Sequence, residues 1–269
     1  MLNKKAHIEL TQISARSDNS MMSYIIKTSN NKTIVIDGGL KIEAETLKQY
    51  IQKYGNKVDY WFITHPHKDH VGAFIDIVEN SDIKIENIYY SINSQEWYNE
   101  NEPNRAYEAE EFYRAIQNEK IKEKAKTPQI GDKIKIGKNI YVEILQTANP
   151  EITYNAINNS SMVFKIHVND KTILMLGDIG PEASEKLIKK YGKNLKSDIV
   201  QMSHHGQSGA TEEFYKLVEP EICLWQSPQW LWDNVTGTFK TLETRKWMEN
   251  LGVKTNYVAK DGDITITVE

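Results

Sequence analysis

The stretch Thr64-His65-Pro66-His67-Lys68-Asp69-His70 follows directly on the largely apolar run 58–63, and together they decide the fold. A short apolar run of this kind predicts a buried strand. The three imidazoles and the carboxylate therefore lie where a strand ends and a loop begins, which is where open α/β sheets bind their ligands. Histidine mixed with aspartate suits zinc or a similar divalent ion in an open, catalytic site.

The spacing within this stretch indicates two neighbouring metal positions. Alternate residues of an extended segment point the same way, so His65 and His67 can bind one ion as a pair. Asp69 and His70, just past the turn, face a second position. A histidine-rich polar turn without function is the weaker interpretation, because four candidate ligands rarely coincide with a strand end.

The motif resembles the HxHxDH signature of the metallo-β-lactamase superfamily, and other segments agree with it. They are the opening strands and Asp-Gly turn at 20–39, the strand 171–178 and the strand 198–206, which ends in His-His-Gly. The His-His-Gly form and the segment 158–161 resemble the hydrolase domain of ComEC-like DNA-uptake proteins and the related phosphocholine esterases. The resemblance implies an α/β (α+β) fold, a four-layer αβ/βα sandwich of two mixed sheets with flanking helices.

Composition and patterning indicate one ordinary globular domain. The chain has 269 residues, of which 39% are hydrophobic and 26% charged, and it can bury a substantial core. Strands and helices alternate without a repeat or a low-complexity linker, so we expect a single domain over 1–269. Residues 94–127 differ, since they are rich in charge with apolar positions at near-helical intervals. We expect a helical insertion there, over the site side, with mostly solvated charges.

Charge and hydropathy limit the partners. The net charge of −4 gives no global attraction for nucleic acid, and 120–138 is the only lysine-rich run. No apolar run approaches the length that crosses a bilayer, and residues 1–7 contain no apolar signal-peptide core. We therefore expect a cytoplasmic protein without a membrane partner, and nothing indicates its oligomeric state.

The resemblance implies a pair of divalent ions, with zinc expected and manganese as the alternative. It implies that six side chains hold them: His65 and His67 for metal one, Asp69, His70 and His204 for metal two, and Asp178 as a bridge. A bridging carboxylate keeps two cations close by partly cancelling their repulsion. Asp69 is also expected to orient the attacking water as a catalytic group.

His205 is expected to play a separate, catalytic part. Adjacent residues at a strand end do not readily point at the same ion, and His204 comes first after the strand. His205 then faces the substrate, as a proton donor to the leaving group or as a phosphate contact. The opposite assignment of His204 and His205 stays open, as does a hydrogen-bonded loop role for His205.

Metal one is expected to be the weaker site. Many members of the superfamily supply another histidine between the first motif and the bridging aspartate, but the only one here is His167, which reads as an ordinary strand residue. Asn158, Asn159 and Ser160 occupy that place, and Asn159 is expected to contact the substrate. Asp37 and Thr64 are expected to orient ligating imidazoles from behind.

The segment 225–234 holds three tryptophans near a predicted strand end. We expect Trp230 and Trp232 to line the substrate site. Indole faces stack on nucleobases or hold a quaternary ammonium by cation–π attraction. Ordinary hydrophobic packing is the alternative.

Together these features predict a binuclear metal-dependent hydrolase that uses metal-activated water on phosphodiesters or phosphoesters. The charge favours a small-molecule or nucleotide phosphoester over nucleic acid as the substrate. A lactonase or thioesterase is the enzymatic alternative, since the same metal pair polarises carbonyls. An inactive metal-binding module is the alternative outside enzymes.

Overall fold

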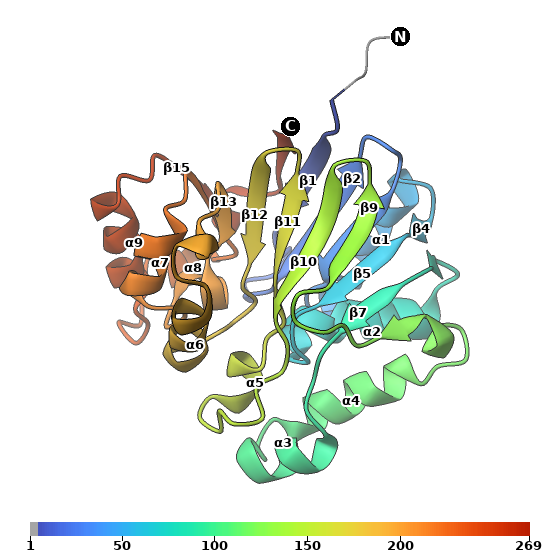
Figure 1. Ribbon diagram of the computed structural model, residues 1–269. Coiled ribbons are helices and arrows are strands. Elements are labelled where there is room, and N and C mark those ends of the chain that lie inside the picture. Colours follow the sequence, from blue (N-terminus) through green and yellow to red (C-terminus); the bar gives the residue numbers. More distant parts are fainter. Residues whose placement is uncertain (1–4) are drawn as a thin grey trace.

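Two seven-stranded sheets stack face to face in the computed structural model, and helices cover both outer faces (Figure 1). The structure describes residues 5–269, so part of the N-terminal stretch 1–7 lies outside the described residues. This architecture confirms the predicted αβ/βα sandwich. Within residues 5–269 no helix combines the length and apolar character that crossing a membrane requires.

The first sheet has the strand order β16-β1-β2-β3-β5-β7-β8. Its strands are β1 (Ile8–Gln12), β2 (Ser23–Thr28), β3 (Thr33–Asp37), β5 (Tyr60–Ile63), β7 (Ile88–Tyr90), β8 (Ala125–Lys126) and β16 (Ile264–Val268). The second sheet has the order β15-β14-β13-β12-β11-β10-β9. Its strands are β9 (Lys133–Gly137), β10 (Ile140–Gln146), β11 (Val163–Val168), β12 (Lys171–Met175), β13 (Ile199–Gln201), β14 (Ile222–Trp225) and β15 (Thr255–Val258). The short strands β4 (Lys57–Val58) and β6 (Lys84–Ile85) pair separately.

Two groups of helices cover the outer faces of the sheets, and shorter helices connect the other elements. Over the first sheet lie α1 (Ala44–Lys53), α2 (Lys68–Asn80) and α4 (Ala106–Ile116), and over the second lie α6 (Pro181–Tyr191), α7 (Glu212–Val218) and α9 (Thr241–Asn250). The shorter helices are α3 (Gln95–Asn101), α5 (Ala156–Asn159) and α8 (Gln229–Trp232). Figure 1 shows α3, α4 and α5 gathered below the lower edge of the sheets.

Alternation along the strands sorts the apolar side chains into layers. On β3, Ile34 and Ile36 face the second sheet, while Val35 faces the outer helices. On β5, Phe62 faces inward and packs on Phe164 of β11, with ring centroids 5.1 Å apart. Burial of both faces explains why these strands are nearly continuous apolar runs.

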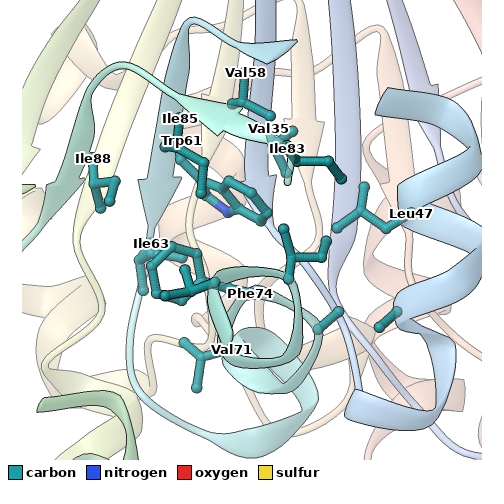
Figure 2. Packing of buried hydrophobic residues seen from close by; sticks show 14 of the residues in the cluster. Val35, Leu47, Val58, Trp61, Ile63, Val71, Phe74, Ile83, Ile85 and Ile88 are labelled. Carbon is teal, nitrogen blue, oxygen red and sulfur yellow. The ribbon is translucent and has the colours of Figure 1, made fainter. Parts of the chain in front are cut away.

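Apolar side chains on the outer face of the first sheet pack against α2, the helix that begins within the histidine motif (Figure 2). Trp61 of β5 meets Phe74 of α2 edge to face, with centroids 5.0 Å apart, and its indole N–H donates to the Asp37 carbonyl at 2.6 Å. Such aromatic pairs add to the free energy of area burial. This packing fixes α2 behind β5, so the loop between them, which carries His65 and His67, has a defined path.

Both sheets are antiparallel in one half and parallel in the other. β3 runs parallel to β5, and β12, β13 and β14 run parallel to one another. The segments that follow these strands therefore emerge at one edge of the sandwich. That edge is where ligands bind in parallel sheets.

The close packing of α2 against residues 40–41 can be tested at Gly72. A Cβ on this residue would lie 2.5 Å from the Lys41 backbone nitrogen and 3.0 Å from the Leu40 carbonyl carbon. Glycine-to-alanine changes inside helices ordinarily stabilise by about 0.5–1 kcal/mol, but here overpacking against backbone costs about 1–3 kcal/mol. We expect Gly72→Ala to lower the free energy of unfolding in urea, measured with a chelator present so that bound ions contribute nothing.

The matched control is Glu79→Ala, at an exposed position of the same helix, which should change that free energy by less than about 0.5 kcal/mol. A Gly72→Ala protein as stable as the parent would contradict the described contact between α2 and the segment 40–41.

Candidate metal centre

Titratable side chains from distant parts of the sequence meet at this edge. They are Asp37 at the end of β3, His65 and His67 in the loop after β5, Asp69 and His70 in the first turn of α2, Asp178 after β12, and His204 and His205 after β13. The sheet topology brings them together, because each follows a strand whose carboxyl end lies at the same edge.

The Asp178 carboxylate is the centre of the cluster. Its Oδ2 atom lies 3.3 Å from His70 Nε2 and 3.4 Å from His205 Nε2. The same oxygen lies 3.9 Å from the Nε2 atoms of His65 and His204. Asp178 is 1% exposed, so this carboxylate depends on the surrounding imidazoles rather than on water.

Two groups of candidate ligand atoms share this centre. His65, His70 and Asp178 form one group, and Asp69, His70 and His205 form the other, with the atoms of each group within 4.8 Å of one another. His67 joins through its Nδ1 atom, 3.0 Å from His65 Nε2. The motif residues and the distant Asp178 and His205 thus lie close enough to bind the same ions.

Unpaired atoms show that this cluster suits cations. The Nε2 atoms of His70 and His205 and the Oδ1 atom of Asp178 are buried without a hydrogen-bond partner among the described residues. Such groups are costly to leave unsatisfied. Several imidazoles with carboxylates are the donors that zinc and related divalent ions prefer. The residues present therefore fit a pair of divalent ions.

The carboxylates are held in their ligating form. Burial disfavours the charge of Asp178, but attraction to His70 and His205 outweighs it and holds the pKa of Asp178 well below its usual range. Burial likewise opposes the charge of Asp69, but the adjacent imidazoles of His205 and His70 bring the pKa of Asp69 below its usual range.

A buried carboxylate fixes the orientation of His70. The Asp37 Oδ2 atom lies 2.8 Å from His70 Nδ1, which leaves Nε2 directed at the cluster. Asp37 is held in turn by the backbone N–H and the hydroxyl of Thr64, both at 2.8 Å. Carboxylates in this position fix the tautomer of a ligating imidazole. The geometry thus gives Asp37 and Thr64 the supporting positions expected of them.

Other partners hold the outer nitrogens of two further imidazoles. His65 Nδ1 lies 3.2 Å from the Ser161 hydroxyl, and His205 Nδ1 lies 3.3 Å from the Gln226 carbonyl. Ser161 also accepts the Asp178 backbone N–H at 3.0 Å. Each ring therefore has one nitrogen fixed by protein and one turned to the cluster.

The structure places His205, rather than His204, among the inner atoms. His205 Nε2 lies 3.2 Å from Asp69 Oδ2, and its side chain is 2% exposed. The His204 side chain is 21% exposed and lies beside Asn158, with 3.4 Å between His204 Nε2 and Asn158 Nδ2. This arrangement favours His205 as the metal ligand, whereas the order of the two residues after the strand favours His204.

The backbone explains the exchange. His204 and His205 both lie in the left-handed region, with φ of 52° and 57°, so the chain after β13 turns sharply. Alternation along a straight strand therefore does not apply to them. Gly206 continues the turn at φ of 82°, where a Cβ would lie 2.2 Å from the Trp225 ring.

Asn159 does not reach the centre. Its amide oxygen accepts the Gly180 N–H at 2.9 Å, and its amide nitrogen donates to the Tyr154 carbonyl and to Glu182 at 2.9 and 3.0 Å. These bonds hold Asn159 at the start of α6, so its amide is already satisfied by protein. The substrate contact expected of Asn159 stays a prediction, and the neighbouring Asn158 has a buried Oδ1 atom without a partner among the described residues.

The two tryptophans have different surroundings. Trp230 lines a cavity of about 580 Å³ that Gln226 also lines. Trp232 packs edge to face on Trp225, at 5.3 Å, and the Arg245 guanidinium covers its ring at 4.1 Å. Trp230 therefore lines a cavity next to Gln226, whose carbonyl is the partner of His205, whereas Trp232 is not among the residues that line it.

Sequence reasoning missed three charged residues of the insertion. Arg105 donates to both carboxylate oxygens of Glu108, at 2.8 and 2.9 Å, and Glu108 is 2% exposed. Arg105 Nη2 lies 4.0 Å from Asp69 Oδ1, and Glu102 Oε1 lies 3.9 Å from His67 Nε2. Most charges of the insertion are exposed, as expected, and these three are exceptions to that pattern. The only earlier signal for them was the insertion's predicted place over the site.

Comparison with known families agrees with this geometry. The family model of the metallo-β-lactamase superfamily matches residues 20–224. The chain belongs to the metallo-β-lactamase superfamily. ComE operon protein 3 of Bacillus subtilis (strain 168) is 22% identical over 173 residues, which cover 62% of this chain and 20% of that protein. Competence protein ComA of Neisseria gonorrhoeae is 31% identical over 68 residues, 25% of this chain and 10% of that protein. The chain spans a small part of each relative.

Solved structures share the fold of this superfamily member. The metallo-β-lactamase fold protein YhfI of Bacillus subtilis has a TM-score of 0.60 at 12% identity, covering 97% of this chain and 100% of its own. Igni18, a metallo hydrolase of Ignicoccus hospitalis KIN4/I, has a TM-score of 0.55 at 15% identity, covering 98% and 99%. A diphosphatase from the PhnP family has a TM-score of 0.51 at 10% identity, covering 97% of both chains.

The adjacent histidines can be told apart by metal content. We expect His205→Ala to lose the ion held with Asp69 and His70, because a buried inner nitrogen disappears. His204→Ala should retain both ions, because that ring lies outside the two ligand groups. Elemental analysis after dialysis against zinc measures both variants, and loss of an ion from His204→Ala alone would contradict this assignment.

Proposed function

We propose that this protein is a binuclear metal-dependent hydrolase of phosphodiesters or phosphoesters. The observation that carries the proposal is the buried Asp178 carboxylate, whose Oδ2 atom lies within 3.9 Å of the Nε2 atoms of four imidazoles, two of them without a hydrogen-bond partner among the described residues. Two divalent ions held there would neutralise phosphoryl oxygens and lower the pKa of water. Zinc is the proposed ion, with manganese as the alternative, because the donor set mixes imidazole and carboxylate.

Six side chains are proposed to hold the ions. They are His65 and His67 for metal one, Asp69, His70 and His205 for metal two, and Asp178 for both. The assignment differs from the sequence-based one in the exchange of His204 for His205. Every other proposed ligand is the residue expected from the motif.

Asp69 and His204 are proposed to act on the substrate side. One Asp69 oxygen meets His205 at 3.2 Å, while the other lies 4.0 Å from Arg105. We propose that this second oxygen orients the attacking water and accepts its proton. His204, which is partly exposed at the edge of the cluster, is proposed to donate a proton to the leaving group.

A cavity lined by Gln226, whose carbonyl is the partner of His205, supports a small substrate. Its volume, about 580 Å³, lies within the range of small-molecule sites, roughly 300–1,000 Å³. Trp230, Arg16, Lys260 and Asn19 line it, a mixture that suits a polar or phosphorylated group. With a net charge of −4, a nucleotide or another small phosphoester is preferred over nucleic acid. The diphosphatase of similar fold indicates that this sandwich accommodates phosphoester chemistry.

The first test is hydrolysis of bis-p-nitrophenyl phosphate by the metal-loaded chain. We expect turnover that a chelator abolishes and that Asp69→Ala reduces at least about 100-fold, because that change removes a ligand and a general base together. Asp76→Ala, two turns further along α2 and paired with Lys48 at 2.7 Å, is the matched control and should retain activity.

Full metal loading without turnover of the phosphodiester would contradict the proposal. Turnover of lactones or thioesters under the same conditions would assign the centre to carbonyl chemistry. No turnover of any of these substrates would indicate a metal-binding module.

The two metal sites are expected to differ in affinity. Metal one has His65, His67 and the shared Asp178, whereas metal two has Asp69, His70, His205 and the same carboxylate. Calorimetric titration with zinc should therefore show a tight and a weaker class of ion. Two equally tight ions would contradict the proposed ligand sets.

A further inference from the structure

Glu102 enters the centre from the insertion. It lies between α3 and α4, and one carboxylate oxygen accepts the Ile157 backbone N–H of α5 at 2.8 Å. The other oxygen, Oε1, lies 3.9 Å from His67 Nε2. Its side chain is 21% exposed, so the carboxylate sits at the rim of the centre and is tied to α5.

His67 uses its two nitrogens in opposite directions. Nδ1 faces His65 Nε2 at 3.0 Å, so this is the atom placed to share an ion with His65. Nε2 points the other way, towards Glu102, and is buried without a hydrogen-bond partner among the described residues. A ligating imidazole ordinarily donates its outer N–H to a carboxylate, a carbonyl or water.

The other imidazoles already have such partners in the sandwich or the loops at its edge. Asp37 serves His70 from β3, and the Gln226 carbonyl serves His205 from the end of β14. Among the proposed imidazole ligands, His67 is the one that faces a carboxylate of the insertion. The single carboxylate within 4.0 Å of its Nε2 in the part of the chain described, residues 5–269, is that of Glu102.

We infer that Glu102 is the positioning residue of metal one. Its carboxylate accepts the Nε2–H of His67, which fixes the tautomer that leaves Nδ1 free for the ion and holds the ring plane. Oε1 is the oxygen that Ile157 leaves free, and the inferred bond requires it to approach Nε2 by about 1 Å. This inference rests on the binuclear centre proposed above.

The consequence is that the insertion controls the weaker metal site. Ile157 directly precedes Asn158, which faces His204, so one carboxylate connects His67, α5 and the substrate side. The imidazoles of metal two are supported from β3 and the end of β14, whereas His67 of metal one is supported from the segment between β7 and β8. The occupancy of metal one is then expected to depend on the position of the insertion.

Cobalt titration of the full chain, followed by visible absorption and calorimetry, tests this role. We expect Glu102→Ala to weaken one of the two classes of ion about 10–100-fold and to alter its absorption bands, with the other class unchanged. Glu102→Gln keeps an acceptor oxygen and should restore most of the affinity. Glu100→Ala, exposed on α3, is the matched control and should bind like the parent.

A double-mutant cycle separates positioning from a general effect on the fold. In a His67→Ala background, Glu102→Ala should weaken cobalt binding no further, because the residue acts through that ring. An equal further loss would overturn the inference. If Glu102→Ala does not fold, Glu102→Asp, whose carboxylate is one methylene shorter, takes its place in both measurements.

Failure of this inference differs from failure of the proposed function. A Glu102→Ala chain that binds both classes of cobalt as tightly as the parent, with unchanged spectra, overturns the role of Glu102 alone. A parent chain that binds fewer than two ions overturns the binuclear centre itself.

Discussion

The structure depends on the charge balance around one buried carboxylate. Asp178 is 1% exposed, and its Oδ2 atom meets imidazole nitrogens at 3.3 and 3.4 Å. Removing an ionised group from water costs several kcal/mol unless partners compensate it. Imidazoles supply part of this compensation, and inner atoms of His70, His205 and Asp178 remain unpaired. The proposed pair of cations would complete this balance, which is what distinguishes a metal centre from a polar core.

The fold makes this cluster possible by placing the ends of parallel strands at one edge. The pairs β3–β5 and β12–β13 each contribute residues immediately after the strand ends. Tight packing of Trp61 on Phe74 and the bond from its indole to the Asp37 carbonyl connect the core to the centre. The positions of the inner atoms therefore depend on the sandwich, while the insertion contributes Glu102 beside His67.

Much of the fold followed from the sequence. The apolar run before His65 contains β5, the insertion 94–127 contains the helices α3 and α4, and the two-sheet sandwich implied by the resemblance is confirmed. These features have local signals, either a period of apolar residues or ligands at a fixed spacing. The convergence of Asp178 on the motif followed from the family resemblance, since nothing local connects residues so far apart.

The remaining features depend on tertiary contacts, which produce no periodic pattern in the sequence. A left-handed turn exchanges the positions of His204 and His205, and side-chain polarity alone does not reveal that turn. The Asn159 amide oxygen accepts the Gly180 N–H and so binds the start of α6. Arg245, from a helix further along the chain, covers the Trp232 ring. Glu102 reads as one more charge in a charged insertion until the fold brings it to His67.

A crystal structure of the zinc-loaded protein, with anomalous scattering recorded at the zinc edge, tests the central claim most directly. Two peaks about 3.5–4 Å apart, one on each side of the Asp178 carboxylate, are the predicted result. A single ion, or ions that Asp178 does not contact, would contradict the account.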